Sequence, residues 1–355
     1  MTRIAQLEPT RVTVGVDTHR DVHVALALDQ LGRRIEQIEL ATTRAGYERL
    51  LGWAEGFGVV DAFGVEGTGC YGAGLARYLR ARDVPVVEVM RPNRQTRRRK
   101  GKSDPADAEA AARAVLSAEA VGSPKAGDDL VEMIRVLRVA RGTAIKARTQ
   151  AINALRSLLV TAPELRDQLR ALSTTRLVGK AAQLRPGEQV SPLAASKLAL
   201  KHLARRCQAL ETEITSLDAQ LAQLTAAACP RLIEAFGVGA DTAGALLVAA
   251  GDNPDRFRSE AAFSMLCGSS PIPASSGKTN RHRLNRGGNR QANAALHRIV
   301  LVRLRYHQAT KDYVQRRTSE GKSKREIIRC LKRYVAREIY TALTQTGEQK
   351  LARAA

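Results

Sequence analysis

Apolar and polar residues alternate in short runs near the start of the chain. Residues 11–17, 21–29 and 33–42 are rich in β-branched or alternating apolar side chains, and Gly32 lies in the turn between the second and third runs. This pattern predicts three consecutive strands that form an antiparallel meander.

The pattern then changes to alternating helices and strands. Residues 43–57 are amphipathic with a helical period, and residues 59–67 are predicted to form a buried strand. Residues 72–83 are then predicted to form a helix, and residues 84–92 a further strand. An Ala-rich helix follows, beginning near Asp104. The order of three strands, helix, strand, helix, strand and helix is that of the ribonuclease H fold, which we expect to place its chemistry at the strand ends.

The middle of the chain is predicted to be helical. Residues 130–160 form a long helical pattern that carries many Arg, whereas residues 161–192 have no pattern that we can interpret. A seam of apolar residues then repeats in steps of four and three, which is typical of a left-handed coiled coil. This seam favours self-association, and the alternative is an internal hairpin that packs back on residues 130–160. The seam consists of Leu203, Cys207, Leu210, Ile214, Leu217, Leu221 and Leu224.

These patterns predict an α/β plus α protein with three parts. Residues 1–120 form a ribonuclease H-like (RuvC-like) domain, 121–228 a helical coiled-coil connector and 229–355 a mostly helical C-terminal domain. The C-terminal domain begins with Gly237-Val238-Gly239 between two apolar helices. This arrangement resembles a helix-hairpin-helix, whose backbone amides meet a phosphate. A tight helix–helix turn that needs glycine is the equally open alternative.

The charge balance favours nucleic acid as the partner. The chain has 57 Lys and Arg against 35 Asp and Glu, a formal net charge of +22, and such a field attracts polyanions. Aromatic residues make up only 4%, which argues against base-stacking platforms and for phosphate contacts. The cationic positions that we expect to bind nucleic acid in the first half are Arg97, Arg98, Arg99, Lys100 and Lys102.

Other protein classes are disfavoured by the composition. No window reaches the ~18 uninterrupted apolar residues of a membrane helix, and the first residues lack the apolar core of a signal peptide, so we expect a cytoplasmic protein. The five cysteines are scattered without a closely spaced partner, which argues against disulfides and structural zinc.

Four carboxylates stand at positions that suit a metal site. Asp17 ends the first strand, Glu66 ends the fourth, and Asp104 and Asp107 share one face at the start of a helix. In a ribonuclease H-type sheet the first and fourth strands are neighbours, so the four would meet and need Mg²⁺ or a similar ion. Two such ions, about 4 Å apart, would clamp the attacking and leaving oxygens of a phosphodiester. The plainer alternative is helix-start chemistry for the Asp pair and turn roles for Asp17 and Glu66.

The nearby histidines are interpreted differently. His19 and His23 are expected to be strand residues rather than ligands, because neutral imidazole suits Mg²⁺ poorly.

A serine-containing basic loop is the second chemical feature. Ser275 and Ser276 precede Gly277-Lys278-Thr279, which imitates the end of a phosphate-binding loop, but Ile272 stands where that motif requires glycine, so an ATPase is rejected. His282 is a weak candidate for a base. The phosphate-binding candidates in this half are Gly237, Gly239, Ser275, Lys278, Arg281, Arg283, Arg286 and Arg290.

Taken together, the segments resemble a known family. VGVDTHRDVH, GVEGTGCYG, KSDPADAEAAARA, GVGADTAGALL, SSPIPASSGKT and RLNRGGNRQANAAL follow one another in the order found in DEDD transposases of insertion sequences of the IS110 class, the bridge-RNA-guided recombinases. The resemblance covers residues 11 to about 340.

The resemblance implies a function for each feature. It implies a RuvC-like Mg²⁺ (or Mn²⁺) site made by Asp17, Glu66, Asp104 and Asp107, and a serine that forms a covalent link to DNA. That serine falls on Ser276, with Ser275 as the rival. It also implies a guide RNA, and dimers or tetramers whose composite sites join the acidic domain of one subunit to the serine domain of another.

Two other functions remain open from the sequence. A metal-dependent junction-resolving nuclease would use the four carboxylates and water, and would form no covalent adduct with DNA. An architectural nucleic-acid binder with an inactive ribonuclease H fold would need neither the carboxylates nor the serine.

Overall fold

The computed structural model of the chain divides into two compact units. One unit comprises Met1–Asp129 with Ala250–Arg258, and the other comprises Leu130–Ala249 with Ser259–Ala355. The structure describes residues 10–89, 103–120, 122–127, 129–187, 190–253, 256–257, 259–278 and 282–354.

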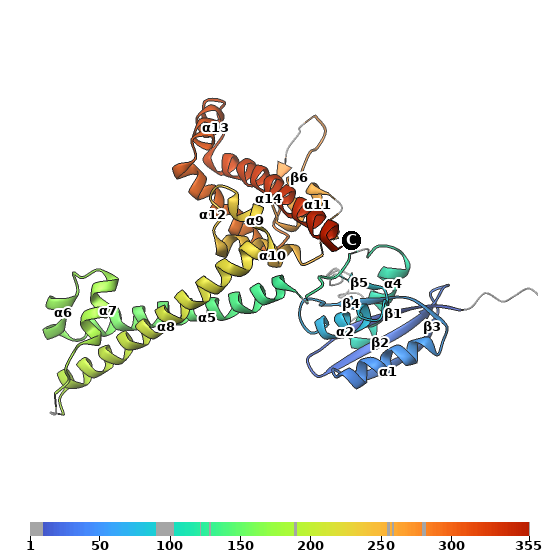
Figure 1. The fold of residues 1–355 in the computed structure, drawn as a ribbon, viewed down its shortest axis with the longest axis horizontal. Coiled ribbons are helices and arrows are strands. Elements are labelled where there is room, and N and C mark those ends of the chain that lie inside the picture. Colours follow the sequence, from blue (N-terminus) through green and yellow to red (C-terminus); the bar gives the residue numbers. More distant parts are fainter. Residues whose placement is uncertain are drawn as a thin grey trace, which may run out of the picture. The chain divides into compact units, whose positions relative to one another are not determined.

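The first unit contains a five-stranded mixed sheet in the order β3-β2-β1-β4-β5 (Figure 1). β1 pairs antiparallel with β2, and β2 with β3, whereas β4 runs parallel to both β1 and β5. The predicted ribonuclease H-like order is therefore confirmed, including the adjacency of the first and fourth strands. The strands are β1 (Arg11–Thr18), β2 (Val22–Asp29), β3 (Arg34–Ala41), β4 (Val59–Glu66) and β5 (Val86–Val89).

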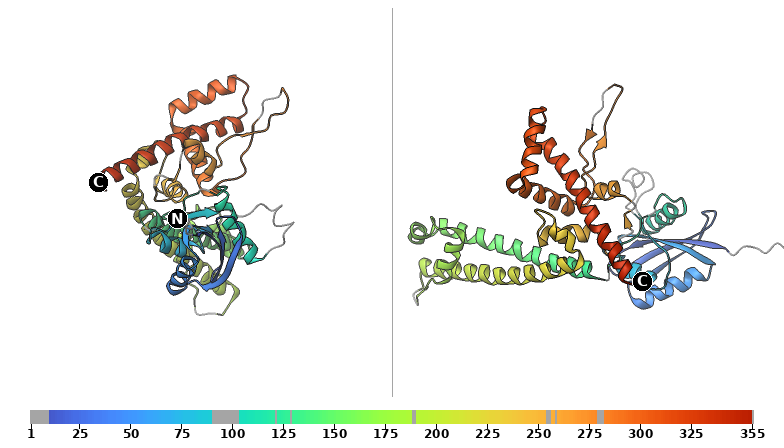
Figure 2. Two further views of the ribbon diagram at one scale, coloured as in Figure 1. Left: turned by 90° about the vertical axis from the view of Figure 1, so that its right-hand side faces the viewer. Right: turned by 45° about the horizontal axis from the view of Figure 1, so that its top comes forward.

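Helices cover both faces of this sheet (Figure 2). On one face α1 (Arg44–Glu55) and α2 (Ala73–Arg80) pack on Val12, Val14 and Val16 of β1, which point to the same side because successive side chains of a strand alternate between its faces. On the other face α4 (Asp104–Leu116) packs its alanines on β2. Residues 13, 15 and 17 of β1 therefore face α4.

In the second unit, two long antiparallel helices lie side by side (Figures 1 and 2). They are α5 (Leu130–Val160) and α8 (Pro192–Ala228). The heptad residues Cys207, Ile214 and Leu221 are buried in this hairpin, so the seam is used within the chain, as the alternative predicted. Self-association stays a prediction.

Residues 161–191, for which the sequence pattern predicted no structure, lie between these helices and contain two short helices. They are α6 (Pro163–Leu169) and α7 (Thr174–Ala182), and they form an apolar core with the ends of the long hairpin. Pro163 stands in the first turn of α6, where its missing N–H costs nothing.

The remaining elements of the second unit are mostly helical. The last helix buries Ile327, Leu331, Val335 and Ile339 along one face. None of the helices in the described ranges is long and apolar enough to cross a membrane. The elements are α9 (Pro230–Glu234), α10 (Ala240–Ala250), α11 (Glu260–Leu266), β6 (Ile272–Pro273), β7 (His282–Arg283), α12 (Arg290–Tyr306), α13 (Gln308–Ser319) and α14 (Lys324–Ala354).

Candidate functional site

Asp17 and Glu66 lie side by side at one end of the sheet. β1 and β4 are parallel, and their register pairs Val16 with Val65, so the next residue of each strand is one of the two acids. Asp17 is 8% exposed and Glu66 is half-buried. The strand period of two places both on the face that α4 covers.

Two paired glycines bring α4 close to this end of the sheet. Gly15 pairs with Gly64 in the register of β1 and β4. A Cβ atom on Gly15 would lie 2.0 Å from the carbonyl oxygen of Ala108, and one on Gly64 would lie 2.8 Å from that of Ala111. The helix backbone therefore rests directly on the strand backbones, two residues before each acid.

The first turn of α4 contributes the other two carboxylates. Asp104 and Asp107 are its acidic first-turn residues; Asp107 is 8% exposed, and its N–H donates to the carbonyl of Ser103 at 3.0 Å. Pro105 follows Asp104 in the helix's first turn, which favours a helix start at this point. Negative side chains are also stabilising at the positive N-terminal end of a helix. The same two acids therefore favour the start of α4 and belong to the candidate site.

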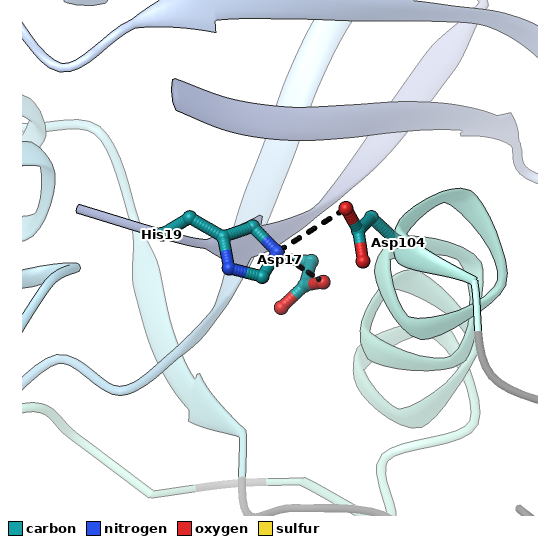
Figure 3. Close-up of side chains that lie close together, drawn as sticks. All are labelled: Asp17, His19 and Asp104. Atoms are coloured by element: carbon teal, nitrogen blue, oxygen red, sulfur yellow. Dashed lines mark ion pairs between the residues drawn. The ribbon is translucent and has the colours of Figure 1, made fainter. Parts of the chain in front are cut away.

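His19 also belongs to this group, although its position in the sequence did not predict this. The residue lies just beyond β1, and its Nε2 atom is 3.2 Å from Oδ2 of Asp17 and 3.4 Å from Oδ2 of Asp104 (Figure 3). Ligand atoms of these three residues all lie within 4.8 Å of one another. His19 lies outside the strand, so that part of the expectation was wrong, while its exclusion from the metal ligands stays a prediction. His23 is a buried residue of β2 whose ring stacks on Tyr47.

The electrostatics of Asp17 show that the carboxylates act on one another. Burial raises the pKa of Asp17, His19 lowers it, and the charges of Glu66, Asp107 and Asp104 raise it further, so that the pKa lies above its ordinary value. Like charges held this close disfavour ionisation. A hard divalent cation would relieve the repulsion, and the donor set of carboxylates fits such an ion.

Two separate sets of hydrogen bonds support the loop that follows Glu66. The Thr18 hydroxyl donates to the carbonyl of Glu66 at 2.8 Å, and the Thr68 hydroxyl donates to Oε1 of Glu88 at 2.9 Å. Oε2 of Glu88 accepts from Nη2 of Arg256 at 2.9 Å. Arg256 belongs to the short segment 250–258 that the first unit takes from the second half of the chain.

The serine pair lies in the second unit, on the hairpin formed by β6 and β7. Ser275 and Ser276 are both exposed, and Gly277 next to them has φ of +56°, a conformation that favours glycine. The predicted cations on this hairpin and beyond it are also exposed where they are described. They are Lys278, Arg283, Arg286 and Arg290, whereas Arg281 and the loop cations Arg97, Arg98, Arg99, Lys100 and Lys102 lie outside the described residues.

Glycines and asparagines close the base of this hairpin. A Cβ on Gly288 would lie 2.5 Å from the carbonyl oxygen of Leu266, so the chain after the hairpin contacts the end of α11, which precedes the hairpin. Asn293 donates from Nδ2 to the carbonyls of Cys267 and Gly268, and Asn289 caps α12 through its side chain. The segment RLNRGGNRQANAAL, which contains the phosphate-binding candidates Arg286 and Arg290, therefore also has a structural function.

The Gly237-Val238-Gly239 turn packs inside the second unit. Gly237 has φ of +81°, and a Cβ there would lie 3.3 Å from Val302 of α12. The N–H of Gly239 donates to the Thr242 hydroxyl at 3.0 Å. These contacts support the tight-turn interpretation, and phosphate binding by Gly237 and Gly239 stays a prediction.

Comparison with protein families gives two matches along the chain. Residues 14–162 match the DEDD transposase family of IS110 elements, described as "Transposase". Residues 229–315 match the family described as "Transposase IS116/IS110/IS902 family". No curated protein matches the chain. The first match contains the four carboxylates and the second contains the serine hairpin, and we conclude that the chain belongs to the IS110 family of DEDD transposases, enzymes that act on DNA.

Proposed function

We propose that this transposase cuts and rejoins DNA through a phosphoserine intermediate on Ser276, together with a metal-dependent acidic site. The observation that carries the acidic part is the convergence of Asp17, Asp104 and His19, with the charges of Glu66 and Asp107 acting on Asp17. The exposure of Ser276 in a loop with Lys278 and Arg283 supports the serine part.

The serine step is a transesterification. The Ser276 hydroxyl oxygen attacks the phosphorus of a phosphodiester, an oxygen–phosphorus bond to serine forms, and the bond to the leaving deoxyribose oxygen breaks. The serine proton is lost, and the leaving oxygen takes up a proton to become a hydroxyl. Attack by a new hydroxyl on the phosphoserine reverses the step, so the DNA is rejoined without ATP.

The acidic site has a distinct task in this proposal. Asp17, Glu66, Asp104 and Asp107 would hold a divalent cation, and His19 would orient Asp17 and Asp104. Bound there, the ion supplies Lewis acidity toward phosphoryl oxygens. The close packing of α4 on Gly15 and Gly64 fixes the carboxylates before DNA arrives, as a preorganised site requires.

A covalent-adduct assay tests the proposal. End-labelled DNA carrying an element end is incubated with the chain and Mg²⁺ or Mn²⁺, and the protein is separated on a denaturing gel. We expect a labelled adduct, its loss in Ser276→Ala, its retention in Ser275→Ala, and its loss in Asp17→Asn without a fall in melting temperature. An adduct that persists in Ser276→Ala contradicts the assignment of the nucleophile.

The same assay separates the competing functions. Cleavage of DNA without any adduct would indicate a hydrolytic junction nuclease. Recombination that survives Asp17→Asn while DNA binding falls would indicate an architectural protein.

We further propose that a bridge RNA guides the enzyme and that it acts as a dimer or tetramer with composite sites. The net charge of +22 supports a second polyanion besides DNA. Sequence specificity would then come from base pairing, with Lys and Arg holding backbones. Recombination in a purified system that needs no added RNA after ribonuclease treatment would contradict the guide. A monomeric mass for the DNA-bound protein would contradict the composite sites.

A further inference from the structure

A cationic pocket of about 800 Å³ lies beside the base of the serine hairpin, within the second unit. One wall is the hairpin base, including Pro271, His282 and Arg283, and the other is one face of α14 with the residues just before it. Lys322, just before α14, and Arg329, in the second turn of the helix, both line this wall.

Part of the positive charge in the pocket is already used. Glu260 of α11 forms ion pairs with Arg333 and Arg337, and Nζ of Lys332 donates to Oδ1 of Asn293 at 2.5 Å. These contacts hold α14 against the rest of the unit. They do not involve the other cations that line the pocket, Arg283, Lys322 and Arg329.

Other cations in the pocket lack such partners. Among the described residues, none forms an ion pair with Arg283, Lys322 or Arg329. The pocket's acidic residue, Glu326, accepts from the N–H and the hydroxyl of Ser323, at 2.9 and 2.7 Å, which caps the start of α14. Glu326 also interacts electrostatically with Lys322 and Arg329 and offsets part of their charge, but the cations outnumber it and the wall stays net positive toward a ligand.

An aromatic ring completes the pocket. Tyr334 is 52% exposed, and its edge contact with Tyr313 fixes the ring. A cationic groove with an exposed aromatic ring is the combination by which proteins hold single-stranded nucleic acid, because the backbone meets the charges and a base stacks on the ring. The volume is that of a small-molecule site, so a duplex would reach only its rim.

The chain connects this pocket to the nucleophile. Pro271 lines the pocket and precedes Ser276 by five residues, which span at most roughly 18 Å when fully extended. At about 3.4 Å per nucleotide, this corresponds to roughly five nucleotides of one strand.

We propose that this pocket holds the backbone and one base of the DNA strand that Ser276 attacks, within a few nucleotides of the attacked phosphate. The proposed function supplies the identity of the bound strand, and this part of the inference rests on it. The binding itself is inferred from the pocket alone.

The test uses the full chain and a fluorescent oligothymidylate of roughly ten nucleotides, titrated at several salt concentrations. The double variant Lys322→Gln/Arg329→Gln is compared with Lys324→Gln/Arg325→Gln, which removes two cations from the same helix start but outside the pocket. We expect the pocket variant to raise Kd roughly tenfold and to reduce the slope of log K against log salt by about 1.4. The control should change Kd by about twofold or less.

A third variant examines the ring. Tyr334→Leu should raise Kd roughly fivefold and leave the salt slope unchanged, because it removes stacking but no charge. Equal losses in the two double variants would overturn the pocket, as would a Tyr334→Leu variant that binds normally. An oligouridylate that binds more tightly than oligothymidylate and is the one affected would overturn the assignment to DNA.

Failure of this inference is distinguishable from failure of the proposed function. If the unaltered chain forms no serine adduct, the proposed function is overturned, while the binding measurements still decide the pocket. If Lys322→Gln/Arg329→Gln forms the adduct at the normal rate with limiting DNA, the pocket proposal is overturned and the phosphoserine stands.

Discussion

In the first unit the acidic residues stand on two paired strands and on a helix whose backbone touches them, whereas in the second unit Ser276 stands on an exposed hairpin whose strands are two residues long. Asp17 and Asp107 are each 8% exposed, while the serine and its neighbours are open to solvent. The first arrangement is fixed by sterics before any ligand arrives. The second arrangement leaves Ser276 exposed to a substrate.

This difference suits the two chemical tasks. A metal site needs several carboxylates held against their mutual repulsion, which requires rigid packing. A nucleophile that must reach a DNA backbone benefits from access, and loops on a rigid scaffold supply it. Substitutions should therefore act through stability in the first unit and through local geometry in the hairpin.

The largest effect is expected for Gly15→Ala. The new Cβ would lie 2.0 Å from the carbonyl oxygen of Ala108, so α4 must move away from the sheet. We expect a loss of about 3 kcal/mol or more in the free energy of unfolding and a loss of metal-dependent cleavage. Chemical denaturation measures the first and the adduct assay the second. Gly52→Ala, in an exposed part of α1 where a Cβ meets nothing within 4 Å, should be neutral or stabilising.

Arg256→Met should rank second. It removes the partner of Glu88, whose other oxygen holds Thr68 in the loop after Glu66, and leaves a part-buried carboxylate unpaired. The expected destabilisation is about 3 kcal/mol, with slower cleavage at saturating Mn²⁺. Thermal unfolding and single-turnover cleavage are the measurements, with exposed Arg49→Met of α1 as control. Normal cleavage by a destabilised variant would show that the chain of bonds does not position the acidic site.

Asp241→Asn tests how much the ion pairs of Asp241 stabilise the second unit. This carboxylate pairs with Arg138, Arg141 and Arg298; burial raises its pKa, but these three cations lower it, and the net pKa lies below the ordinary 3.8. The contribution to stability is therefore present above pH 3.8 and is lost as the pH falls through the lower, folded-state value. We expect Asp241→Asn to cost about 2 kcal/mol at pH 7, and the difference from the unaltered protein to shrink in strong acid.

The control for this variant is Asp167→Asn, at an exposed position of α6. At each pH from 7 down to 3, its melting temperature should equal that of the unaltered protein. A constant penalty for Asp241→Asn at all pH values would contradict the ion-pair explanation.

The smallest effect on global stability is expected for Gly277→Ala. Its φ of +56° is unfavourable for alanine, but a Cβ there meets nothing within 4 Å, so the cost of about 1 kcal/mol stays in the hairpin. Adduct formation should slow roughly fivefold without a change in melting temperature. Gly187→Ala carries the same kind of strain, with φ of +81° in open space, and should not affect the adduct. A large fall in melting temperature for Gly277→Ala would show that the hairpin is part of a packed core.

The candidate site was only partly predictable. Asp17 and Glu66 could be found because parallel strands end at one edge, a rule that needs only the order of elements. His19 could not, since its ring position depends on how the chain leaves β1; the only signal was its place two residues after Asp17. The heptad from Leu203 to Leu224 was correctly predicted as a seam, but the sequence left two partners open, a second chain and residues 130–160, because helices within one chain and between chains satisfy the same period.

The sequence by itself determined the order of strands and helices, the acids at the strand ends and the cationic balance, because these follow from local periodicity and from composition. Tertiary structure alone decided that Gly15 and Gly64 meet beneath α4, that α8 packs on α5, and that Arg283 and α14 enclose one pocket. Such pairings join residues that are distant in the chain. They are selected by the shape of the packed surfaces, and no local pattern carries that information.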